Sequence, residues 1–180
     1  MTERLHVNAT RMELMQLRRR LGVAVHGHAL LKDKLEGLMA EFMELVENYR
    51  QTRRDFDEEY PRVAGLFLVA GAVASRDVVE DAIAQSGGRL TLQTGTRKIL
   101  SVRVPHFKAH VEPGSGYSLL ETPLELDDAT REMERFLPRI LEMAEQEHAI
   151  WLLMEEIERT RRRVNALEYI MIPQLRETVK

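Results

Sequence analysis

From Leu14 to Glu59, positions that follow one another in alternating steps of three and four residues are mostly apolar. Eleven of the fourteen positions in this series are apolar, whereas the overall hydrophobic content of 44% would place about six there. A spacing of 3.5 residues sustained over so many turns is typical of a coiled-coil seam. No proline interrupts it before Pro61, so the segment predicts a helix about 70 Å long. Such a helix needs a partner of similar length.

A matching series lies near the other end of the chain, where an apolar residue recurs every seven positions from Phe136 to Met171. Four of the six companion positions, three residues later in each heptad, are polar. About 75 residues between the two series allow the chain to fold back, which favours an intrachain antiparallel pair. Pairing between two copies of the chain is the alternative. The predicted seam residues are Leu14, Leu17, Leu21, Leu31, Leu35, Leu38, Phe42, Leu45, Met143, Ile150, Leu153, Ile157, Val164 and Leu167.

The middle of the chain has a different pattern. Residues 63–85 read as a further helix, with Ser75 and Asp77 as candidate caps, and Ser86-Gly87-Gly88 breaks it. Apolar and polar residues then alternate at 90–92 and 100–104, which predicts a β-hairpin with its turn at Gly95 and its end at Pro105.

The sequence therefore predicts a mainly α protein, a long antiparallel two-helix coiled coil with a small middle region that contains a short helix and a β-hairpin. The expected division is residues 1–60 for the N-terminal coiled-coil helix, 61–126 for the middle region and 127–180 for the C-terminal coiled-coil helix.

Composition and motifs exclude several classes of function. The net charge of −3 favours no nucleic acid, and the absence of cysteine removes disulfides and thiolate chemistry. There is no phosphate-binding loop, and His106 and His110 lack an evident third metal ligand. The longest apolar run, residues 63–74, is too short for membrane insertion. We expect a soluble cytoplasmic protein without catalytic residues, metal or cofactor.

Two arginine clusters are the most conspicuous charged features, namely Arg18, Arg19 and Arg20 near one end and Arg161, Arg162 and Arg163 near the other. Both fall in the half of an antiparallel pair that lies away from the middle region. One interpretation is an ordinary solvated face. The other is a basic collar for acidic partners, because a guanidinium stays charged and offers forked contacts.

Specific segments carry a resemblance to a known family. The N-terminal helix contains VNATRMELMQLRRRL and GHALLKDKLEGL, and the C-terminal helix contains RTRRRVNALEYIMIPQLRETV. Together these segments resemble the D subunit, the central rotor stalk of V-type and archaeal-type (V/A) rotary ATPases. The segment RKILSVRVPHF resembles the family's strand with a Val-Pro step. Family members continue beyond the IPQL segment as a long helix, and the sequence here ends at Lys180 without a C-cap signal.

The resemblance implies a rotor shaft that couples ATP hydrolysis or synthesis in a catalytic hexamer to ion translocation in a membrane ring. The implied partners are the F subunit, the hexamer of catalytic and regulatory subunits, and the subunit that links the stalk to the ring. The arginine clusters would face the hexamer. Apolar residues beside the seam would meet the F subunit, namely Met43, Val46, Leu141 and Trp151. A cytoplasmic coiled-coil scaffold unrelated to ATPases is the alternative, which explains the heptads but not the paired segments.

Overall fold

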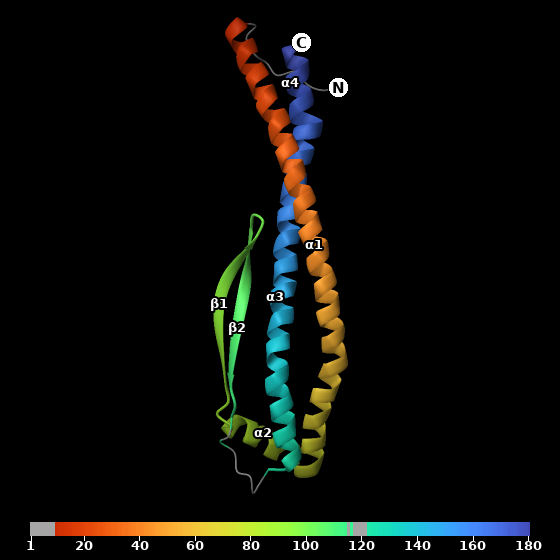
Figure 1. Cartoon of the computed structure of the whole chain (residues 1–180), viewed down its shortest axis with the longest axis vertical. Helices are drawn as coiled ribbons and strands as arrows, with labels where there is room; N and C mark the ends of the chain where they lie inside the picture. The colour runs from red at the N-terminus through yellow and green to blue at the C-terminus, as the bar shows by residue number, and fades with distance from the viewer. Residues whose placement is uncertain (1–9, 115, 117–121) are drawn as a thin grey trace. The chain divides into compact units, whose positions relative to one another are not determined.

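The computed structural model describes residues 10–114, 116 and 122–180, so residues 7–9 of the VNATRMEL segment lie outside the described part. Its elements are shown in Figure 1. In chain order they are α1 (Arg11–Ala74), α2 (Arg76–Gln85), β1 (Arg89–Ile99), β2 (Val102–Glu112), α3 (Leu124–Ala166), a π-helical turn η1 (Leu167–Met171) and α4 (Ile172–Val179).

The chain divides into two compact units. The terminal unit comprises Met1–Met43 and Trp151–Lys180, and the middle unit comprises Glu44–Ile150. The predicted fold class, an antiparallel two-helix coiled coil with a short helix and a β-hairpin between its helices, is confirmed. The three-part division of the chain stays a prediction, and its boundaries at 60 and 127 fall inside α1 and α3.

In the terminal unit, the first half of α1 packs against the end of α3, η1 and α4. The apolar core at the chain ends joins Leu17 and Ala24 of α1 to Ile172 and Leu175 of α4, and Leu21, Leu167 and Val179 pack around it. Further along, Lys34 donates to Glu156 at 2.6 Å, and His28 lies 3.3 Å from Glu168. Residues of rising number on α1 therefore meet residues of falling number on the partner, as an antiparallel pair requires.

In the middle unit, aromatic residues join the two helices. Phe136 of α3 is almost fully buried, and its ring centroid lies 5.2 Å from that of Phe56. Tyr60 stacks on Phe56 at 5.5 Å. Closer to the turn, α2 completes a second small core made by Phe67, Ala70, Val79, Ala82 and Leu126.

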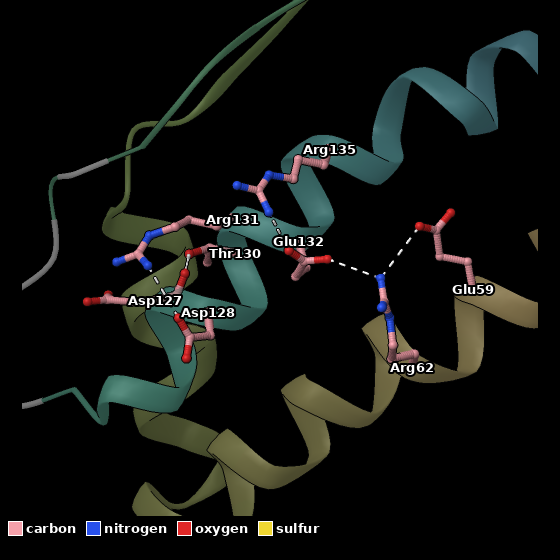
Figure 2. Close-up of polar contacts among 8 residues, drawn as sticks. All are labelled: Glu59, Arg62, Asp127, Asp128, Thr130, Arg131, Glu132 and Arg135. Atoms are coloured by element: carbon pink, nitrogen blue, oxygen red, sulfur yellow. Dashed lines mark hydrogen bonds and ion pairs between the residues drawn. The ribbon is translucent and has the colours of Figure 1, made fainter.

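Ion pairs border this aromatic contact. Figure 2 shows Arg62 of α1 reaching Glu132 of α3 at 3.3 Å, while Glu59 lies 3.6 Å from the same guanidinium. Glu132 also accepts from Arg135 at 2.7 Å, so one carboxylate serves arginines of both helices. Arg139 pairs with Glu59 beside them. Such partly exposed pairs contribute only about 0–1 kcal/mol each to the stability of the fold. Their main effect is therefore to favour this register of α1 against α3 over others.

Helix α1 does not end before Pro61, as the sequence had suggested, but continues to Ala74. Pro61 is exposed, so the backbone carbonyl four residues earlier, which loses its amide donor, is on the solvent side of the helix. The break comes instead at Ser75, whose φ of 81° is left-handed. Ser75 occupies the N-cap position of α2, although its side chain makes no capping hydrogen bond.

The hairpin is longer than predicted, and its turn lies elsewhere. The strands pair from Arg89 opposite Glu112 to Ile99 opposite Val102, so the turn is at Leu100 and Ser101, and Leu100 has a φ of 50°. Gly95 lies inside β1 opposite His106. Pro105 lies inside β2 because both strands of a two-stranded sheet are edge strands, where a missing amide donor need not remove a ladder bond.

The last helical segment begins and ends differently from the heptad prediction. Helix α3 starts at Leu124, three residues before the predicted start at residue 127. At its other end the backbone widens into η1, and the amide of Ile172 bonds to the carbonyl of Leu167, five residues earlier. This extra residue in the turn shifts the seam by one position, so Ile172 and Leu175 are buried while Met171 is exposed. Pro173, which has no amide to donate, follows directly.

Candidate partner-binding surfaces

The C-terminal arginine cluster lies on the outer side of α3. Arg161, Arg162 and Arg163 are all exposed, and they are bracketed by buried Thr160 and Val164. Arg162 pairs with Glu158 at 3.3 Å, and Arg159 with Glu155 at 2.9 Å, so the i,i+4 pairs expected on this helix are present. Arg161 and Arg163 form no ion pair with any residue that the structure describes. Two guanidiniums of the cluster are therefore available to a partner.

The N-terminal cluster lies beside α4. Arg18, Arg19 and Arg20 are exposed and have no ion-pair partner within residues 10–114, 116 and 122–180. Arg19 and Arg20 line an open groove of about 700 Å³ together with Val23 and Met171. Because the core joins Leu17 to Leu175, this cluster lies level with α4 and not with residues 161–163. The two clusters thus form separate basic sites within the terminal unit.

A second surface follows from how the helices face each other. Lys34 and Glu156, which are in contact, each immediately precede a predicted seam residue. The residues that immediately follow a seam residue must then meet on the opposite side of the pair. These include Met39, after Leu38, and Met154, after Leu153. One helical turn further out on the same side lie Met43 and Trp151.

These four residues form one exposed apolar face, which we call the Met–Trp face and define as Met39, Met43, Trp151 and Met154. The exposed fractions run from 43% for Met39 to 57% for Met43, and Trp151 is 53% exposed. The residues from the two helices also lie at the same height along the helix pair, because residues shortly after Lys34 lie across from residues shortly before Glu156. A contiguous exposed apolar patch of this kind is typical of a protein–protein contact.

The helix register therefore places Met43 and Trp151 on one side of the helix pair, but it does not place the other two residues predicted to meet the F subunit there. Val46 and Leu141 belong to the middle unit, where both are half-buried. Met39 and Met154 were missed in the sequence. Their signal was available, since Met39 and Met43 are four residues apart and Trp151 and Met154 three, which places each pair on one helix face. The predicted seam residues are all buried or half-buried.

Polar side chains at other predicted positions have structural partners. His106 lies on an extended strand, as expected, and its Nδ1 is 3.0 Å from a carboxylate oxygen of Glu145. His28 faces Glu168 across the helix pair. The described residues contain no cluster of His, Asp and Glu that could hold a metal ion. None of the described helices has the length and apolar character that crossing a bilayer requires.

Comparison with known proteins assigns the chain to a family. The sequence profile of the family of ATP synthase D subunits matches residues 13–180. The chain belongs to this family. The resemblance inferred from the helical segments is thereby confirmed.

The names of similar proteins agree with this family assignment. The V-type ATP synthase D subunit of Clostridium novyi (strain NT) is 44% identical, over 98% of this chain and 85% of the relative. The protein of the same name from Acetivibrio thermocellus is 43% identical, over 98% and 82% of the two chains. The match therefore includes both helices, the hairpin and η1. A family member of this kind is one component of a V-type ATP synthase complex.

Proposed function

We propose that this chain is the central rotor shaft of a V/A-type rotary ATPase. It transmits torque between ATP hydrolysis or synthesis in the catalytic hexamer and ion translocation in the membrane ring. It catalyses no reaction itself, and it works at the membrane periphery on the cytoplasmic side, without inserting into the bilayer or binding nucleic acid. Membership of the family of ATP synthase D subunits over residues 13–180 is the observation that carries this proposal.

Co-purification tests the proposal against the alternative of a scaffold unrelated to ATPases. A tagged full-length chain, expressed in its own cell, should recover the catalytic and regulatory subunits, the F subunit and the subunit that links the stalk to the ring. A depleted strain should keep assembled hexamers but lose ATP-driven ion pumping. Recovery of unrelated partners without any ATPase component would favour the scaffold.

The arginine clusters support contact with the inner wall of the hexamer. A shaft that turns inside a cavity must exchange one contact for the next without being trapped. Exposed ion pairs contribute only about 0–1 kcal/mol each, whereas a buried apolar contact would hold much more tightly. Arg161 and Arg163, which have no ion-pair partner in the described part of the chain, suit transient pairing with successive acidic groups.

The Met–Trp face supports contact with the F subunit, which would turn with the shaft and so needs a lasting interface. Methionine and tryptophan are well suited to this, because the thioether adapts its shape and a central tryptophan often contributes much of the binding energy. We keep Val46 and Leu141 as predicted contacts in the middle unit, where their half-buried side chains border the helix pair.

Binding to the purified F subunit tests this face. Met43→Glu combined with Met154→Glu should raise the dissociation constant about 100-fold, because the double variant places two charges in an apolar contact. Met12→Glu is the matched control, since Met12 is an exposed methionine of α1 outside the face. Circular dichroism should show unchanged helix content in both variants. Equal affinities of the double variant and the control would remove this face from the interface.

A further inference from the structure

The two halves of the β-hairpin turn opposite faces inward. In the tip half, Val102 and Val104 of β2 are buried. In the base half the half-buried residues are instead Phe107, Ala109 and Val111, which belong to the other face of the strand. The strand register is continuous across this change, so no bulge causes it. The cause is the strong twist of a two-stranded ribbon, which rotates the hairpin relative to the helix beside it.

A single carboxylate holds the hairpin where the faces change. Glu145 of α3 accepts a hydrogen bond from the backbone amide of Phe107 at 2.8 Å and lies 3.0 Å from Nδ1 of His106. Its other oxygen is 3.8 Å from Nε of Arg97 on the neighbouring strand. The side chain of Glu145 is only 13% exposed. Glu145 therefore contacts both strands at the midpoint of the hairpin.

The base of the hairpin is not packed tightly on the helices. An open groove of about 470 Å³ separates Leu90 and Val111 of the hairpin from Phe67, Met133 and Leu137 of α1 and α3. Leu90 and Leu92 remain 43% and 42% exposed, although they lie on the same face as Val111 and Ala109. Apolar surfaces thus face each other across a space that they could close, which burial of apolar area would favour.

The connections at the base permit such a movement. Gly87 has a φ of +69°, a conformation that glycine adopts without strain. Where β2 ends, Gly114 lies so close to Gly88 and Ser86 that a side chain there would meet backbone atoms at 2.7 Å, and the amide of Gly116 donates to the carbonyl of Ser86 at 3.0 Å. The two connections are therefore held together at this point, and the movement we infer concerns the strands beyond it. The eleven-residue strands are paired along their whole length between this base and the turn at Leu100 and Ser101, so they form a single ribbon.

We infer that the hairpin is a lever that rocks about Glu145. In the state described here, the tip is packed through Val102 and Val104 while the base stands open over the groove. In the second state, Leu90, Leu92 and Val111 close on Phe67, Met133 and Leu137, and the tip lifts from α3. The two states exchange one set of apolar contacts for another around the same polar pivot. This inference does not depend on the proposed function.

The absence of cysteine from the sequence allows a direct test with Val104→Cys as the only thiol. In the described state this thiol is fully buried, so a maleimide should reach it only when the tip lifts. Adding Leu90→Trp, which fills the groove and draws the base inward, should raise the alkylation rate about tenfold. Thr91→Trp is the matched control, because Thr91 lies on the opposite face of β1, and it should leave the rate unchanged.

An unchanged rate with Leu90→Trp, or an equal rise with Thr91→Trp, would show that tip and base are not coupled and would overturn the lever. A second measurement guards against misfolding of the tryptophan variants. Leu90→Cys with Leu137→Cys should form a disulfide across the groove in the folded protein under mild oxidation, whereas Thr91→Cys with Leu137→Cys should not. Failure of the first pair to cross-link would equally rule out closure of the base.

Discussion

A threonine hydroxyl lies buried in the helix pairing without a hydrogen-bond partner. Thr160 is 1% exposed, and its Oγ1 contacts no donor or acceptor in the described residues. An unsatisfied buried hydroxyl costs about 1–3 kcal/mol of desolvation. Thr160 thus weakens the packing of α3 at this point, although Leu153 and Val164, on either side of it, are buried.

Replacing this threonine by its apolar isostere should therefore stabilise the protein. We expect Thr160→Val to raise the free energy of unfolding by about 1 kcal/mol, because the shape is kept and the buried hydroxyl is removed. The measurement is urea denaturation followed by circular dichroism. Thr52→Val is the control, since the Thr52 hydroxyl donates to the carbonyl of Asn48, and it should not be stabilising. A destabilised Thr160→Val would mean that the hydroxyl has a partner.

The π-helical turn η1 shifts the register of the seam at the end of α3. Heptads counted from Val164 would place Met171 and Gln174 in the seam. The π-helical turn uses one extra residue and brings Ile172 and Leu175 there instead. Two apolar side chains thereby replace an apolar and a polar one in the core. Tyr169, Ile170 and Met171 become exposed as a consequence.

Deleting one residue from this turn should make the helix regular without changing its core. In a variant that lacks Ile170, which is 57% exposed, an ordinary α-helix would already direct Ile172 and Leu175 toward Leu17 and Ala24. We expect its thermal midpoint to rise, because the wider π turn has poorer backbone geometry. Ile170→Ala is the control for loss of the side chain alone. A midpoint below that of the control would show that the turn itself is needed for packing.

The β-hairpin depends on α3 through Glu145. In Glu145→Ala the amide of Phe107 loses its acceptor, and we expect its hydrogen exchange to accelerate by about tenfold or more, as removal of a charge-assisted bond of about 1.5–3 kcal/mol implies. Nuclear magnetic resonance would measure the exchange. Glu147→Ala, two residues further along α3 and exposed, should leave Phe107 unchanged. Equal protection in both variants would mean that another acceptor replaces Glu145.

At the scale of the whole molecule, charge distinguishes the two units. Basic residues outnumber acidic ones in Met1–Met43 with Trp151–Lys180, whereas acidic residues predominate in Glu44–Ile150. The near-neutral total hides this difference. A basic terminal unit suits acidic groups on a partner, and the arginine clusters concentrate that charge at two places.

We expect Arg161, Arg162 and Arg163 changed together to glutamine to weaken coupling in the reassembled complex. Each lost exposed pair should reduce affinity for the hexamer by up to about fivefold, with a smaller effect at high salt. Assembly, ATPase rate and torque should be measured together. Changing Arg50, Arg53 and Arg54 together to glutamine, in the middle unit, provides a matched loss of three charges. If the triple variant keeps wild-type assembly, rate and torque at low and moderate salt, its arginines form only a solvated face.

The heptads, the alternation in the middle of the chain and the paired helical segments were sufficient to predict the coiled coil, the region of the hairpin and the family, because heptad spacing and alternation are properties of residues close together in the sequence. Tertiary packing decided the rest. The exposed face at Pro61 lets α1 continue, the burial of Ile172 and Leu175 selects the π turn, and Glu145 meets Phe107 only once α3 and the hairpin lie side by side. The Met–Trp face likewise exists only in the folded chain, since residues more than a hundred positions apart form it through the antiparallel register.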